Sequence, residues 1–121
     1  MATPTIYTPK RLALPQQLPS STGTLYTSPA APGVGTQVTS TKLVNTTAAP
    51  VLVTIYVVES GGTAADNRAL CKNFSVPADG LPYELLEGAE AQFYLNAGDT
   101  LQGLAGAASS ITIHLSGVEL E

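Results

Sequence analysis

Short segments in which apolar residues alternate with polar ones, or run without a break, recur along the chain from residue 22 onward. Glycine, proline and asparagine separate them at intervals of about 8 to 12 residues, as in β-sandwiches. The segments predict strands at 22–28, 37–45, 51–58, 68–76, 91–95, 100–105 and 110–120. The stretch 81–91 fits either a short helical turn or a further strand. The pattern predicts a single all-β domain, a β-sandwich or jelly roll of about eight antiparallel strands.

The segment 51–58 has the densest run of β-branched residues and is apolar on both faces. One face holds Val51, Val53, Ile55 and Val57, and the other holds Leu52, Tyr56 and Val58. A strand of a two-sheet sandwich needs only one buried face, so the N-terminal segment, a loop or another subunit must cover the second. We take Leu52, Tyr56 and Val58 as candidate partner-binding residues and expect a homo-oligomer, a dimer or a trimer.

The N-terminal segment 1–21 contains prolines at positions 4, 9, 15 and 19, among threonine, glutamine and serine. This spacing prevents a helix and removes hydrogen-bond donors from a central strand. It predicts an extended arm over residues 1–21, followed by a β-sandwich domain over residues 22–121. Because the arm has no acidic residue and includes two adjacent cations, we expect it to contact another chain. Its candidate partner-binding residues are Tyr7, Lys10, Arg11, Leu12 and Leu14.

Charge is distributed unevenly along the sequence. Residues 1–58 hold three cations and no acid, whereas residues 59–121 hold two cations and nine acids, which gives +3 and −7 within a net charge of −4. Folding can mix the two halves into one surface with an acidic bias. Alternatively, the basic arm docks on an acidic surface of a partner or sister subunit, because complementary charge steers and orients association.

The same composition excludes two classes of partner. Five basic residues scattered through an acidic chain do not form a stripe that follows phosphates, so we predict no nucleic-acid partner. No run approaches the ~20 apolar residues of a membrane span, and the first residues lack the apolar core of a signal peptide. We therefore expect a soluble protein that is made in a cytosol and has no membrane partner.

Residues that suggest chemistry are few, and each has a plainer structural role. His114 is the only histidine, and one histidine without further ligands builds neither a zinc site nor a Ser-His triad. Cys71 has no flanking pattern that would lower its pKa, so a small buried thiol is the expected role. Glu84, Glu87 and Glu90 would share one side of a helix; solvated charge is the expected role and a calcium or magnesium site the alternative.

The segment Asn96-Ala97-Gly98-Asp99 has the composition of a hairpin turn. Gly98 would supply a positive φ, and Asn96 or Asp99 would accept hydrogen bonds from nearby backbone amides. A catalytic Asp99 is the functional alternative. Since no two titratable groups share a spacing typical of an active site, we predict that the protein is not an enzyme and that it holds no cofactor or metal.

Four short motifs occur in a fixed order over residues 22–121. They are TLYT at 24–27, NTT at 45–47, AGDT at 97–100 and SGVE at 116–119. In this order and spacing the chain resembles the small jelly-roll or β-sandwich structural proteins of tailed bacteriophages. It departs from them at 81–91 and in its longer proline-rich arm.

This family includes capsid cement or decoration proteins as well as small tail and fibre-attachment components. The resemblance implies a virion protein on the outer capsid surface that bridges neighbouring major-capsid-protein subunits and stabilises the shell. The alternative that it implies is a small tail, baseplate or fibre-attachment protein that binds the host.

Overall fold

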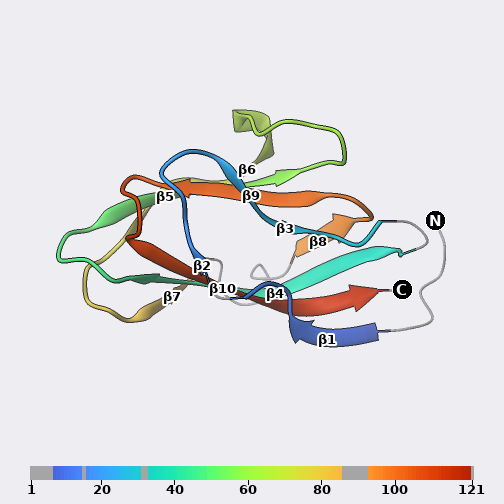
Figure 1. Ribbon diagram of the computed structural model, residues 1–121, viewed down its shortest axis with the longest axis horizontal. Coiled ribbons are helices and arrows are strands. Elements are labelled where there is room, and N and C mark those ends of the chain that lie inside the picture. The colour runs from blue at the N-terminus through green and yellow to red at the C-terminus, as the bar shows by residue number, and fades with distance from the viewer. Residues whose placement is uncertain (1–6, 15, 31–32, 86–92, 121) are drawn as a thin grey trace.

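In a computed structural model of the chain (Figure 1), the described residues are 7–14, 16–30, 33–85 and 93–120. These residues form ten β-strands and one short 3₁₀ helix. The elements are β1 (Tyr7–Arg11), β2 (Gln16–Gln17), β3 (Gly23–Thr27), β4 (Gly35–Asn45), β5 (Val51–Val58), η1 (Asp66–Arg68), β6 (Ala69–Val76), β7 (Pro82–Glu84), β8 (Phe93–Asn96), β9 (Thr100–Ala105) and β10 (Ile111–Leu120). Over this part of the chain no helix has the length and apolarity needed to cross a membrane.

The strands form two antiparallel sheets that pack as two layers (Figure 1). In the first, called sheet A, β10 and β4 are central; β1 and β2 pair one after the other with β10, and β7 and β8 pair with β4. In the second, called sheet B, the order is β3-β9-β5-β6. The chain is therefore an all-β sandwich, as the sequence pattern predicts.

The strand order identifies the type of sandwich. If β1 with β2, and β7 with β8, are each counted as one interrupted strand, the chain has eight strand segments in the orders 1-8-3-6 and 2-7-4-5. Segment 1 then pairs with 8, 2 with 7, 3 with 6 and 4 with 5, as in one long hairpin folded over on itself. This is the eight-stranded double Greek key of a jelly roll, and the prediction of about eight antiparallel strands is confirmed.

Alternation along the strands builds the core. In β10, Ile111, Ile113 and Leu115 are buried between the sheets, whereas His114 and Ser116 are exposed. The register of β10 against β4 shifts between Ser116 and Gly117. A Cβ at position 117 would lie 2.2 Å from the backbone oxygen of Gln37, so only glycine fits there.

A bulge in β3 brings two consecutive side chains into the core. The register of β3 against β9 shifts between Thr24 and Tyr26. Leu25 and Tyr26 are consequently both buried, where strict alternation would bury only one of them. The bulge aims the Tyr26 ring between the two sheets.

The N-terminal segment differs from the expected arm. Its described residues form the outer strand of sheet A, because β1 and β2 both pair with β10. Leu12 and Leu18 donate backbone hydrogen bonds to β10 and are buried in the core. The prolines are compatible with this role. Pro9, which has no amide hydrogen to donate, lies in an edge strand, where one side of the backbone has no neighbouring strand to bond. The boundary expected after residue 21 does not separate this segment from the sandwich.

The second face of β5 is covered in part by a loop, which is one of the three expected alternatives. The connection from β5 to β6 includes η1, which packs against β5 and lies outside sheet B (Figure 1). Val58 is 1% exposed and Tyr56 is half-buried, whereas Leu52 is 48% exposed. The exposed apolar face is thus much smaller than the sequence predicts.

In the following strand β6, which is an edge of sheet B, Asn73 has a φ of 56°.

Candidate functional site

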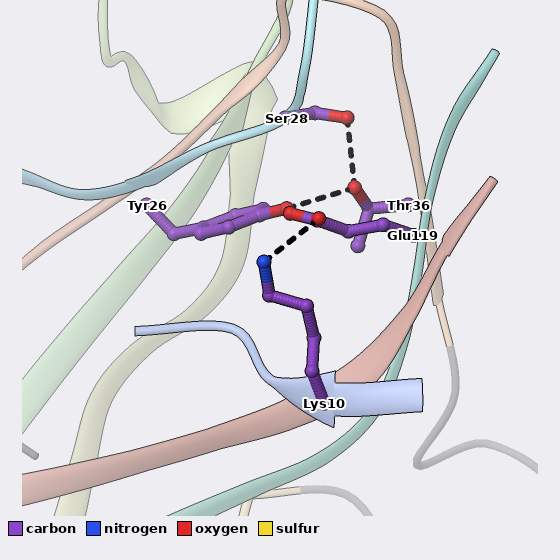
Figure 2. Close-up of polar contacts among 5 residues, drawn as sticks. All are labelled: Lys10, Tyr26, Ser28, Thr36 and Glu119. Atoms are coloured by element: carbon purple, nitrogen blue, oxygen red, sulfur yellow. Dashed lines mark hydrogen bonds and ion pairs between the residues drawn. The ribbon is translucent and has the colours of Figure 1, made fainter. Parts of the chain in front are cut away.

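A chain of polar side chains lies at one end of the sandwich and links the two sheets (Figure 2). The Tyr26 hydroxyl donates to Oε2 of Glu119 at 2.5 Å and lies 3.0 Å from Oγ1 of Thr36. Oγ of Ser28 lies 2.9 Å from Oγ1 of Thr36. Nζ of Lys10 donates to Oε1 of Glu119 at 2.9 Å. We call these five residues the polar clip.

The direction of each hydrogen bond in the polar clip follows from the number of protons. Tyr26 has one hydroxyl proton, which it donates to Glu119, so Thr36 must donate to Tyr26 and Ser28 to Thr36. Burial raises the pKa of Tyr26, and its hydrogen bond to Glu119 raises it further. Burial also disfavours the charge of Glu119, but the hydrogen bonds from Tyr26 and Lys10 and the charge of Lys10 outweigh it, so the pKa of Glu119 lies below its ordinary value.

The polar clip has the properties of a structural connection. Glu119 and Tyr26 are buried, and both carboxylate oxygens of Glu119 are engaged by donors. The raised pKa keeps the Tyr26 hydroxyl protonated at neutral pH, which makes it a poor base or nucleophile. Tyr26 lies in β3 of sheet B, and Ser28 directly follows that strand. The other three members lie in β1, β4 and β10 of sheet A, so the clip joins the two sheets. Lys10 thereby fixes the N-terminal strand to the rest of the domain.

The turn between β8 and β9 follows the hairpin interpretation. Asp99 accepts hydrogen bonds from the backbone amide of Asn96 through Oδ2 and from that of Ser60 through Oδ1, each at 3.0 Å. Gly98 has a φ of 82°, as expected. The backbone oxygen of Asp99 also accepts from the amide of Ser28 at 2.8 Å. Both carboxylate oxygens therefore hold loops together, and the interpretation of this segment as a turn is confirmed.

The NTT motif is a second turn fixed by one side chain. Asn45 is buried, and its Nδ2 donates to the backbone oxygens of Ala49 and Val76. Its Oδ1 accepts from the amide and the hydroxyl of Thr47. All the bonds of this side chain go to the chain itself, so Asn45 determines how β4 leads into β5.

The other residues considered for chemistry are scattered. His114 is exposed on the outer side of β10. Burial raises the pKa of Cys71, only partly offset by a backbone hydrogen bond, so its thiol is less reactive than a free one. Glu84 accepts from Oγ of Ser40 and from the amide of Thr41, whereas positions 87 and 90 lie outside the described residues. Within the described ranges no group of three or more His, Cys, Asp or Glu side chains is arranged to hold a metal ion.

The candidate partner-binding residues of the N-terminal segment are not equally accessible. Lys10 is bound to Glu119, and Leu12 is buried in the core. Arg11 is exposed, and Leu14 is 73% exposed. The backbone of Tyr7 pairs with β10, and its side chain lies outside the described part of the structure.

The candidates on β5 lie apart from these. Leu52 is exposed on the outer side of sheet B, Tyr56 is half-buried and Val58 is buried, so they do not form the continuous apolar surface that the sequence predicts. Arg11 belongs to sheet A, the opposite layer, and Leu14 lies between β1 and β2 of that sheet. The structure therefore does not bring the eight candidates together.

Several side chains lie together on the outer face of sheet A, and Arg11 is the one among them that the sequence analysis names as a candidate for partner binding. Arg11 lies opposite Ser116, and His114 lies opposite Lys42, with all four side chains on the side away from the core. Tyr94 of β8, which is 40% exposed, lies on the same side. Alternation in β10 places His114 outward, but no signal in the sequence indicates that β4 and β8 lie beside it.

Comparison of the chain with protein-family models, with curated proteins and with solved structures found no match.

Proposed function

We propose that this protein is a structural component of a tailed-phage virion that binds the outer capsid surface and bridges neighbouring major-capsid-protein subunits. The observation that carries the proposal is the set of four motifs at 24–27, 45–47, 97–100 and 116–119, which resembles small virion proteins in order and spacing. As a cement protein it would act as a dimer or trimer and stabilise the shell by binding only its assembled form.

The motifs coincide with the contacts that hold the sandwich together. TLYT contributes Tyr26 and SGVE contributes Glu119, which bond to each other in the polar clip. AGDT contributes Asp99, whose backbone oxygen accepts from the amide of Ser28 in that clip, and NTT contributes the turn around Asn45. The residues that carry the resemblance are therefore fold-determining. A jelly roll hosts many functions, so this agreement supports common architecture, and the step to a capsid location is the proposal itself.

Copy number distinguishes the capsid from the tail. Particles released from the strain that encodes the chain would be purified and the protein quantified against the major capsid protein by mass spectrometry. We expect hundreds of copies per particle. A handful of copies would favour the tail or fibre-attachment alternative, and absence from purified particles would refute a virion role.

Removal of the gene gives a second test. Particles without the protein should assemble normally but release DNA at a lower temperature or after milder osmotic shock than wild-type particles. Particles that are equally robust and fail to adsorb to cells would contradict the cement role and support host binding.

A further inference from the structure

The outer face of sheet A combines side chains that are common in protein interfaces. Tyr94 lies opposite Gln37, which lies opposite Val118, so an aromatic, an amide and an aliphatic side chain form one row across the sheet. Arg11 and Lys42 lie further along the same face, on β1 and β4. Tyrosine and arginine are enriched in interfaces and frequently dominate their binding energy.

This face also holds the cations that have no ion pair. Lys10, Arg68 and Lys72 are each paired with a carboxylate of the chain, through Glu119, Glu59 and Asp66 respectively. Within the ranges that the structure describes, Arg11 and Lys42 are exposed and have no salt bridge. In a chain of net charge −4, the two cations without a salt bridge in these ranges thus lie on the same side of one sheet.

The carboxylate of Glu84 belongs to the same part of sheet A. It lies opposite Lys42 in the pairing of β4 with β7. Its Oε2 accepts from Oγ of Ser40 at 3.0 Å and its Oε1 from the amide of Thr41 at 2.8 Å. These bonds turn the carboxylate toward β4 and leave the Lys42 ammonium accessible to a partner.

We infer that the outer face of sheet A is the docking face for an acidic protein surface, with Arg11 and Lys42 as its charged contacts and Tyr94 as its aromatic contact. The inference rests on the proposed function, in which that surface belongs to the capsid shell. Charge complementarity selects the partner, because both cations are exposed on this face and neither forms a salt bridge within the described ranges. Two cations do not follow a phosphate backbone, which favours protein over nucleic acid.

The test uses purified protein added to particles that lack it, with bound protein measured after sedimentation. Arg11→Gln/Lys42→Gln removes two positive charges from the face. The matched control, Thr24→Glu/Ser75→Glu, gives the same net charge through exposed positions of sheet B. We expect the first variant to lose roughly tenfold in affinity with a weaker salt dependence, and the control to stay within about twofold of wild type.

Each outcome decides between the inference and the proposed function. Failure of the wild-type protein to bind particles would overturn both. Binding of the wild type together with unchanged binding of Arg11→Gln/Lys42→Gln, or an equal loss in the control, would overturn the docking face alone. In an independent measurement on bound protein, acetylation of Lys42 should be suppressed while Lys72 stays reactive; equal labelling of the two would also contradict this face.

Discussion

Replacing Tyr26 by phenylalanine tests whether the polar clip holds the two sheets together. The change keeps the buried ring and removes only the hydroxyl. Oε2 of Glu119 then loses its 2.5 Å donor, and the hydroxyl of Thr36 loses its acceptor. The variant therefore leaves Oε2 of Glu119 without its donor and the Thr36 hydroxyl with Ser28 as its remaining partner, both at buried positions.

The expected cost follows from these two losses. A hydrogen bond to a charged group contributes about 1.5–3 kcal/mol, and a buried group left unsatisfied adds its own desolvation penalty. We expect Tyr26→Phe to lower the free energy of unfolding at pH 7 by about 3 kcal/mol. The matched control is Tyr94→Phe, because the Tyr94 hydroxyl is on a 40% exposed side chain and makes only a 3.4 Å contact with the backbone oxygen of Val34. It should cost less than about 0.5 kcal/mol.

The assay is urea unfolding followed by circular dichroism, at pH 7 and at about pH 3. The folded-state pKa of Glu119 is lowered, so its contribution is complete above the unfolded-state pKa of about 4.3 and is lost as the pH falls through the folded-state value. The deficit of Tyr26→Phe should therefore shrink in acid. A deficit below about 0.5 kcal/mol at pH 7, or one equal to that of Tyr94→Phe, would refute the argument.

Three further predictions concern the fold. Deleting residues 1–17 removes β1 and β2, so we expect loss of the cooperative thermal transition; a folded, monodisperse truncation by circular dichroism and gel filtration would show that the segment is dispensable. Gly117→Ala should cost about 3 kcal/mol in urea unfolding, because its Cβ would meet the backbone oxygen of Gln37, whereas Gly106→Ala, 3.6 Å from its nearest neighbour, should cost under about 1 kcal/mol. Asn45→Ala should cost about 2–3 kcal/mol and lower the melting temperature accordingly, and a change within 0.5 kcal/mol would contradict the role of its side chain in the turn.

The strand pattern could be predicted from the sequence because alternation and turn residues are local properties. The expected strands at 37–45, 51–58 and 100–105 differ from β4, β5 and β9 by two residues at most. The turn at Asp99 follows from the same local signals. The periodicity of side chains and the conformational freedom of glycine are enough to predict these strands and this turn, without knowing which segments pack beside them.

The features that local patterns missed depend on pairing between distant segments. The four prolines indicate an extended segment, but the sequence contains no signal that β10 offers it a free edge. The loop that contains η1 packs against β5, and the burial of both Leu25 and Tyr26 depends on a bulge. The polar clip unites residues that lie up to 109 positions apart, which no spacing rule reveals.

The edges of the two sheets are poor templates for an incoming strand. An incoming strand needs a straight, continuous row of free amides and carbonyls. Pro9 removes an amide from β1, and the positive φ of Asn73 turns the backbone of β6. A bulge interrupts β3, and β7 and β8 offer only three and four residues. These interruptions oppose fibril-like growth by strand addition, even where many copies are concentrated on one surface. Any assembly of this protein must therefore form through the faces of the sandwich, where side chains select the partner.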